Sequence, residues 1–186
     1  MTIDPITRRP LTPPDVEAAT RVVRLRELRL GEHPDPEFDK FAAELATTAG
    51  TSFAMVNFID EEQQYFSGLY VAPPAGNAAL AAETAVQVGR TMPKDYGWCP
   101  HVVARRLALV LDDVCDYPRF ATNPVVDKVG IRSYLGAPLI DRTGTTLGTI
   151  CVVDNETHSW GRDGLAFIKT RAAEMVDLIH QRELRA

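Results

Sequence analysis

The sequence predicts a single domain that mixes helices with β-strands. Three observations carry this prediction: a hairpin pattern at residues 135–154, alternating apolar residues at 52–71, and helix-type periodicity at both ends of the chain. With 186 residues, of which 45% are hydrophobic and 24% charged, the chain is long enough to bury one core. We therefore expect one folded domain over residues 14–186, preceded by a flexible N-terminal arm, residues 1–13, that is rich in Thr and Pro.

Two helices are predicted before the first strand. The first begins near Pro14, because proline suits the first turn of a helix, and ends before Gly31. The second extends from about residue 36 to residue 48, since its apolar residues share one face and Gly50 follows as a terminator. The predicted buried stripe of the first helix repeats at heptad spacing at Val16, Val23 and Leu30, and it is broadened by Ala19, Val22 and Leu25.

Two hairpins are predicted from the alternation of residue character. Residues 52–59 and 64–71 form strands on either side of the acidic turn 60–62. The second hairpin turns between Asp141, which can hydrogen-bond its own backbone, and Gly144, which supplies a left-handed conformation. The strand after this turn is apolar on both faces, which indicates a central strand that is covered on both sides.

The segment between the two hairpins contains only short predicted elements. Residues 72–97 are irregular apart from an Ala-rich stretch at 78–85 that favours a short helix, and a loop of this length is either functional or mobile. A short helix at 98–106, a strand at 107–111 and a short helix at 125–129 follow. Most of this region is therefore expected to cover the sheet rather than to extend it.

A long C-terminal helix is predicted from about Arg162. Its apolar residues step by three and four positions along a narrow stripe that consists of Leu165, Ile168, Ala172, Met175 and Ile179. A stripe of this kind is typical either of packing against one or two partner helices or of docking on the domain's own sheet. Both alternatives stay open at the level of the sequence.

Charge and composition exclude several classes of function. The net charge of −5 gives no general attraction for polyanions, so we expect no nucleic-acid partner. No apolar run reaches the roughly 18 residues that span a bilayer, and the N-terminus lacks the apolar stretch of a secretory signal. We expect a cytoplasmic protein without a membrane partner. The three cysteines, Cys99, Cys115 and Cys151, are not closely spaced, and reduced thiols are expected.

Four segments, in their order along the chain, resemble the GAF domain family. They are CPHVV at 99–103, LVLDDVCDYPRFATNPVV at 109–126, IRSYLGAPL at 131–139 and TLGTICVVD at 146–154. The order of helices and strands extends the resemblance from about residue 22 to residue 184. It implies an α+β fold in which an antiparallel sheet of five or six strands carries the N- and C-terminal helices on one face. A ligand cavity is implied under short helices and loops on the other face.

The resemblance also implies a function. GAF domains commonly bind small molecules such as cyclic nucleotides, amino acids, haem or bilins, and often dimerise through their terminal helices. We therefore expect a non-catalytic, small-molecule-sensing regulatory domain that forms a homodimer and acts on a separate effector protein. The sequence does not identify the ligand or a cofactor.

The stretch from residue 96 to residue 101 is the best candidate for a pocket, because aromatic walls with a few polar groups are what a small-molecule site requires. A structural role is an equal or better explanation for several candidates. Trp98 and Tyr96 can close the core, Asn123 suits a turn, and Arg132 can pair with a nearby Asp. The predicted ligand-binding residues are Tyr96, Trp98, Cys99, His101, Phe120, Asn123, Arg132 and Tyr134.

Metal binding and covalent attachment of a chromophore are not expected. Cys99 and His101 supply two ligands where structural zinc needs four, so no metal site is predicted. Phytochrome-like GAF domains attach a bilin at an adjacent Cys-His pair, and Pro100 separates the two residues here.

Two other functions stay open as alternatives. Free methionine-R-sulfoxide reductases also use a GAF fold, so a thiol-dependent reductase of small oxidised metabolites, such as free methionine sulfoxide, is the second hypothesis. No catalytic residue of that family is assigned to this chain, because the positions of its cysteines differ from the pattern of the family. The third hypothesis is a protein-interaction module whose cavity is filled by side chains.

Overall fold

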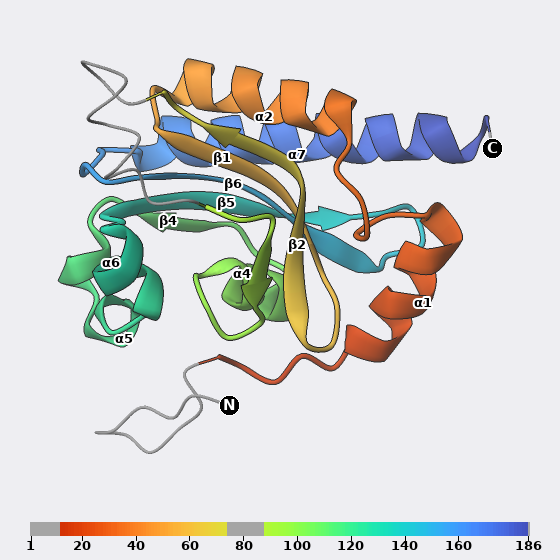
Figure 1. Ribbon diagram of the computed structural model, residues 1–186, viewed down its shortest axis with the longest axis horizontal. Coiled ribbons are helices and arrows are strands. Elements are labelled where there is room, and N and C mark those ends of the chain that lie inside the picture. Colours follow the sequence, from red (N-terminus) through yellow and green to blue (C-terminus); the bar gives the residue numbers. More distant parts are fainter. Residues whose placement is uncertain (1–11, 74–87, 186) are drawn as a thin grey trace.

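The computed structural model describes residues 12–73 and 88–185. The strands within these residues are β1 (Phe53–Ile59), β2 (Gln63–Val71), β3 (Thr91–Pro93), β4 (Leu109–Leu111), β5 (Ser133–Ile140) and β6 (Thr146–Asp154). They form one antiparallel sheet in the order β3-β2-β1-β6-β5-β4 (Figure 1). The predicted α+β class with a five- or six-stranded antiparallel sheet is confirmed.

Helices cover both faces of this sheet (Figure 1). On one face lie the two longest helices of the described residues, α2 (Pro36–Ala49) and α7 (Gly161–Glu183). On the other face lie three short helices, α4 (Cys99–Arg105), α5 (Pro118–Ala121) and α6 (Pro124–Val129). Two apolar clusters result, one between the sheet and the long helices and one between the sheet and the short helices.

The first helix, α1 (Ala18–Leu28), lies where β1 ends and β6 begins. The predicted stripe is wrong at Val16 and Val23, which are 92% and 56% exposed, whereas Leu25 is buried in the core as predicted. Arg21 also holds the helix: its fully buried guanidinium donates a hydrogen bond to the Ile59 carbonyl at 2.7 Å and pairs with Asp15. A polar contact with the end of a strand, which apolar periodicity does not reveal, therefore positions α1.

The apolar stripe of α7 packs on the domain's own sheet. Ile168, Ala172, Met175 and Ile179 are all buried in the cluster that the long helices share with the strands. Leu165, at the start of the stripe, is 36% exposed. The sequence left open whether this stripe packs on partner helices or on the domain's own sheet. These four residues pack on the sheet.

The hairpin between β5 and β6 has the predicted turn. The Asp141 carboxylate accepts hydrogen bonds from the backbone N–H groups of Thr143 and Thr145 at 2.9 and 3.1 Å, and Gly144 has φ +83°. Beyond the turn, β6 pairs with β1 on one side and β5 on the other. The prediction of a central strand with two covered faces is confirmed.

The middle of the chain differs from expectation in detail. The sequence gives no signal for β3, since three residues are too few to show alternation, and α5 lies in a stretch that was expected to be turns. The strand predicted at 107–111 is shorter and begins at Leu109. The helix predicted at 78–85, and residues 1–11 of the predicted arm, lie outside the described residues. The division into an arm and one domain stays a prediction.

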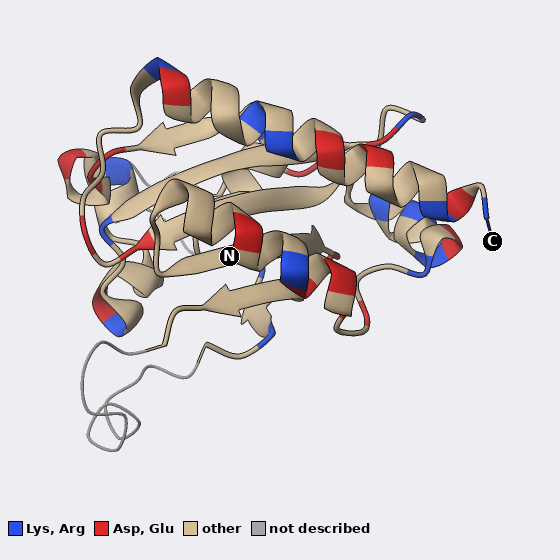
Figure 2. Cartoon of the chain, turned by 90° about the horizontal axis from the view of Figure 1, so that it is seen from above, with Lys and Arg blue, Asp and Glu red and all other residues tan. Residues whose placement is uncertain are grey.

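Acidic and basic residues are interspersed along the helices (Figure 2). Many are paired: Asp35 caps the N-terminus of α2 through the Phe38 N–H and also pairs with Arg182 of α7. The guanidinium of Arg171 lies 4.3 Å from the centre of the Phe41 ring and so joins the same two helices. None of the helices in residues 12–73 and 88–185 has the length and apolar character needed to cross a membrane.

Candidate functional site

An apolar cavity of about 70 Å³ lies between the sheet and the short helices, on the face opposite α2 and α7. Strands β1, β2, β5 and β6 line one side of it, and residues 97–99 and α6 line the other. The volume is about half that of an engineered cavity of about 150 Å³ that holds benzene. It is therefore smaller than the sites that take drug-sized ligands.

Three of the predicted site residues, Trp98, Cys99 and Tyr134, line this cavity. The rings of Trp98 and Tyr134 lie 5.4 Å apart, centre to centre, at a tilt of 56°. The Tyr134 hydroxyl donates a hydrogen bond to the Cys99 sulfur at 3.4 Å. The two sides of the cavity, with Trp98 before α4 and Tyr134 in β5, are thus joined around one buried thiol.

Sulfur atoms gather on this wall, and sequence reasoning missed their association. The Cys99 and Cys151 sulfurs are 3.7 Å apart, although the residues are separated by 52 positions in the chain. The Cys151 thiol also lies 3.9 Å from the sulfur of Met55 in β1. The alternation of β6 places Cys151 and Val153 on one face of the strand, and that signal could have indicated that Cys151 faces the short helices.

The contact between the two thiols shifts their pKa values in opposite directions. A hydrogen bond from Cys151, with further donors at Thr149, Tyr134 and Asn57, lowers the pKa of Cys99 despite its burial. The same hydrogen bond and burial raise the pKa of Cys151. The pair therefore releases its first proton more readily than an isolated thiol in apolar surroundings.

His101 and Phe120 lie in the apolar cluster of this face but do not line the cavity. Their rings meet edge to face, with centres 5.1 Å apart. Burial, with the charges of Arg119 and Arg105, lowers the pKa of His101 to about 4, so the imidazole is neutral at pH 7. Its Nδ1 has no hydrogen-bond partner among the described residues.

Asn123 braces the segment that closes the cavity. Its carbonyl oxygen accepts from the Gly97 N–H and its amide donates to the Gly97 carbonyl, both at 2.9 Å. The same oxygen caps α6 by accepting from the Val125 N–H at 3.3 Å. Gly97 has φ +70°, a conformation that disfavours a side chain at this position. The Asn therefore fixes the start of α4 relative to α6.

Tyr96 and Arg132 lie outside the cavity lining. The Lys128 ammonium lies 4.9 Å from the centre of the Tyr96 ring and donates to its hydroxyl at 3.2 Å. The Arg132 guanidinium pairs with both oxygens of the Asp113 carboxylate, and this ion pair lowers the pKa of Asp113. Arg132 therefore pairs with a nearby Asp, which is the structural role that the sequence analysis gave as the alternative to ligand binding.

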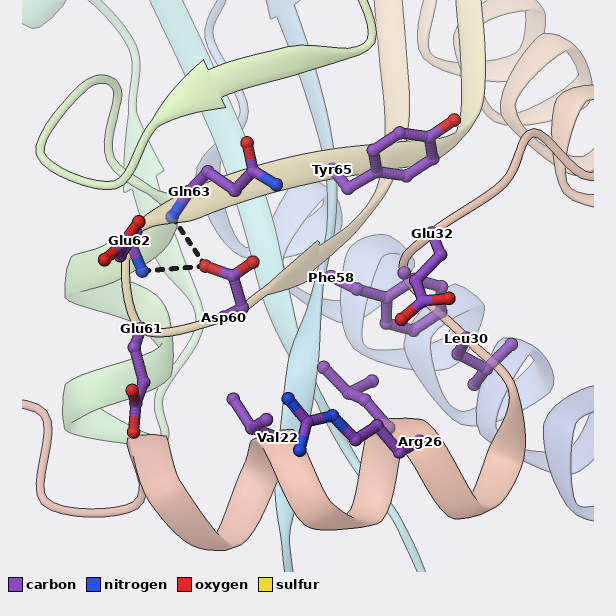
Figure 3. Close-up of a pocket in the computed structure, with 12 residues that line it drawn as sticks. Val22, Arg26, Leu30, Glu32, Phe58, Asp60, Glu61, Glu62, Gln63 and Tyr65 are labelled. Atoms are coloured by element: carbon purple, nitrogen blue, oxygen red, sulfur yellow. Dashed lines mark hydrogen bonds between the residues drawn. The ribbon is translucent and has the colours of Figure 1, made fainter.

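A second hollow of about 320 Å³ lies between α1 and the β1–β2 turn (Figure 3). Arg26 extends into it from α1, and Glu32, Asp60, Glu61 and Glu62 surround it with carboxylates. The Asp60 carboxylate is occupied by hydrogen bonds from the backbone N–H groups of the turn. None of the predicted site residues lines this hollow. Within the described part of the chain, no group of three or more His, Cys, Asp or Glu side chains is placed to hold a metal ion.

Comparison with known sequences gives one family and one curated relative. The family model described as "GAF domain" matches residues 33–177. A cyclic di-GMP phosphodiesterase of Pseudomonas aeruginosa is 27% identical to this chain over 128 residues. That match covers 68% of this chain and 19% of the relative, so the chain spans about a fifth of the relative's length.

Comparison with solved structures gives the same fold. The chain is similar to a free methionine-R-sulfoxide reductase of Neisseria meningitidis, with a TM-score of 0.59, 15% identity and 94% and 96% of the two chains covered. It is also similar to the GAF domain of an Acinetobacter phosphoenolpyruvate-protein phosphotransferase, with a TM-score of 0.57, 16% identity and coverage of 91% and 96%. Sequence identities this low show only that the folds are similar. Because the family model matches most of the residues that build the sheet and both helical layers, the chain belongs to the GAF domain family.

Proposed function

We propose that this chain is a non-catalytic regulatory domain that senses a small molecule bound in the cavity under the short helices. The observation that carries the proposal is the cavity itself, since protein interiors are close-packed and a hollow lined by apolar side chains favours a guest. A volume of about 70 Å³ suits a ligand of only a few non-hydrogen atoms.

A path from the cavity to the long helices runs through β6. Cys151 and Val153 line the cavity, whereas Val152 between them packs in the cluster beneath α2 and α7. Because successive side chains of a strand face opposite sides, a ligand that displaces the cavity face also displaces the helical face. A ligand acts on the partner of the domain by its different affinity for two positions of these helices.

Xenon, a small apolar probe, tests whether the cavity takes a guest. In wild-type protein, xenon should shift the methyl NMR signals of Val125, Val153 and Met55 and change amide hydrogen exchange in α7. The Val125→Phe variant should lose the shifts of Val153 and Met55 because the ring fills the cavity. Val23→Phe, the same change at a position that is 56% exposed, should keep them. Methyl signals that do not respond to xenon contradict a ligand site, and shifts without altered exchange in α7 contradict the signalling role.

We propose a homodimer, or a separate effector protein, as the partner that receives this signal. The four buried residues of the α7 stripe are not free to bind a second copy. A groove between α7 and the β4–β5 edge is free in the isolated chain, and Leu107 and Leu165, which line it, are 61% and 36% exposed. If this groove joins two copies, light scattering should give a dimer for the wild type and a monomer for Leu165→Glu.

The contact between Cys99 and Cys151 favours one second candidate, a thiol-dependent reductase of small oxidised metabolites. A thiol of lowered pKa beside a second thiol is the arrangement that thiol–disulfide chemistry uses. Turnover of free methionine sulfoxide with a dithiol reductant, lost in Cys99→Ser or Cys151→Ser and kept in Cys115→Ser, would favour this candidate over a non-catalytic sensor.

A further inference from the structure

Three sulfur atoms meet at the wall of the cavity. Cys151 stands between the other two, 3.7 Å from the Cys99 sulfur and 3.9 Å from the Met55 sulfur. They come from α4, β6 and β1, so three separate elements of the fold bring them together. All three side chains are at least nine-tenths buried, and all three line the cavity.

From this arrangement we infer that Cys99, Cys151 and Met55 form a site for a soft monovalent metal ion, copper(I), at the wall of the cavity. Thiolate and thioether sulfurs are the ligands that select copper(I), whereas magnesium and calcium require oxygen ligands. The inference names an occupant of the same cavity as the proposed function, and therefore rests on that cavity being able to take a guest.

Two of the three sulfur spacings, from Cys151 to Cys99 and from Cys151 to Met55, are close to those of three-coordinate binding. Three sulfurs at about 2.3 Å from one ion, in a plane with it, lie about 4.0 Å apart, whereas two sulfurs in line with an ion lie about 4.6 Å apart. The observed 3.7 and 3.9 Å are a few tenths of an ångström below the planar value. The adjoining space of about 70 Å³ lets the side chains separate by that amount.

The chemistry of binding balances without a change of oxidation state. Each cysteine S–H bond is replaced by a Cu–S bond, and the two protons pass to solvent, while copper stays in the +1 state. The Tyr134 hydroxyl continues to donate to the Cys99 sulfur and so stabilises the negative charge of the bis-thiolate complex.

The Met55 thioether distinguishes a copper(I) site from other functions of two neighbouring thiols. Thiol–disulfide exchange needs only the cysteines, and the Met55 sulfur has no part in it. Structural zinc is also disfavoured, since it requires four ligands and the described residues bring three sulfurs together here. A soft ion of low coordination number is the ligand that uses all three.

An anaerobic competition experiment tests the site. Reduced protein is titrated with copper(I) held by bathocuproine disulfonate, and transfer is followed by the loss of the chelator's absorbance. Wild type and Cys115→Ser, a matched change at an exposed cysteine, should take up one ion per chain with equal affinity. Cys99→Ser and Cys151→Ser should lose this uptake, and Met55→Leu should bind about tenfold more weakly.

X-ray absorption on the copper-loaded wild type provides a readout that needs no variant. A shell of three sulfurs at about 2.3 Å supports the site. Nitrogen or oxygen neighbours, absence of uptake, or loss of uptake in Cys115→Ser would overturn the inference. If copper is not taken up but xenon still shifts the cavity methyls, the inference fails and the proposed function stands. If neither binds, both fail.

Discussion

Asn123 and Gly97 hold each other by two reciprocal hydrogen bonds of 2.9 Å, in which the Asn side chain pairs with both backbone groups of the glycine. The contact joins the start of α4 to the start of α6, the two elements that cover the cavity. It imitates one step of a β-ladder between segments that are 26 residues apart. The cover of the cavity is thus held by polar contacts as well as by apolar packing.

Replacement of Asn123 should therefore loosen the cavity cover. Asn123→Ala leaves the buried N–H and C=O of Gly97 without their partners, and we expect a loss of about 2 kcal/mol in the free energy of unfolding. Urea denaturation measures it. Asn155→Ala, which removes an exposed side-chain hydrogen bond to the Val129 carbonyl, is the control and should cost about 0.5 kcal/mol. Equal losses in the two variants would contradict the bracing role.

The stability of the protein should depend on His101 in mildly acidic solution. Burial lowers the pKa of His101 to about 4 from 6.5, so the unfolded chain binds a proton at a higher pH than the folded protein does. The stabilisation is therefore complete above pH 6.5 and is lost as the pH falls towards 4, by about 3 kcal/mol in total.

Thermal unfolding of His101→Gln across this pH range checks the prediction. The variant should lack the part of the acid destabilisation that appears between pH 6.5 and pH 4, whereas His33→Gln, at an exposed position, should keep it. A wild-type profile that is flat over this range, or one that His101→Gln leaves unchanged, would show that the imidazole is not buried in its neutral form.

Gly148 marks the closest approach of two central strands. A Cβ atom at this position would lie 1.9 Å from the Asn57 carbonyl oxygen of β1, and a backbone atom cannot give way as a flexible side chain can. We expect Gly148→Ala to lower the free energy of unfolding by about 3 kcal/mol. Gly89→Ala, where no atom lies within 4 Å of the added carbon, is the control and should leave stability within about 0.5 kcal/mol.

The anchor of α1 should depend on a single carboxylate. The Arg21 guanidinium is fully buried and pairs with Asp15, so Asp15→Asn leaves a buried charge without its partner and should cost about 3 kcal/mol. Lys40→Gln, which breaks the exposed pair with Glu44, should cost less than about 0.5 kcal/mol. Calorimetry at pH 7 compares the two, and a similar melting temperature for both would refute the anchor.

The same pair adds a dependence on strongly acidic pH. Burial opposes the ionisation of Asp15, but the hydrogen bonds and charges of Arg21 and Lys94 outweigh it and lower its pKa below 3.8. The pair therefore stabilises the folded state above pH 3.8, and that stability is lost as the pH falls further. In Asp15→Asn the slope of stability against pH below this value should be smaller than in the wild type.

Residues that are neighbours in the sequence were enough to predict most of the helices and strands and the turn between β5 and β6. The turn from Asp141 to Gly144, the central position of the strand that follows it, and the long C-terminal helix each depend on residues that are neighbours in sequence. Apolar residues that repeat every two positions in a strand, or every three to four positions in a helix, indicate which face of that element is buried. The class of the fold and the order of its elements follow from such signals.

Only the tertiary structure decided what each buried face meets. It placed Cys151 against Cys99, turned the α7 stripe onto the sheet, and held α1 by a buried Arg21 instead of the exposed Val23. These outcomes join residues that lie tens of positions apart, and periodicity contains no information about a partner at that distance. The size of the cavity was also decided at this level, because it depends on how closely side chains from separate strands and helices fill the space between them.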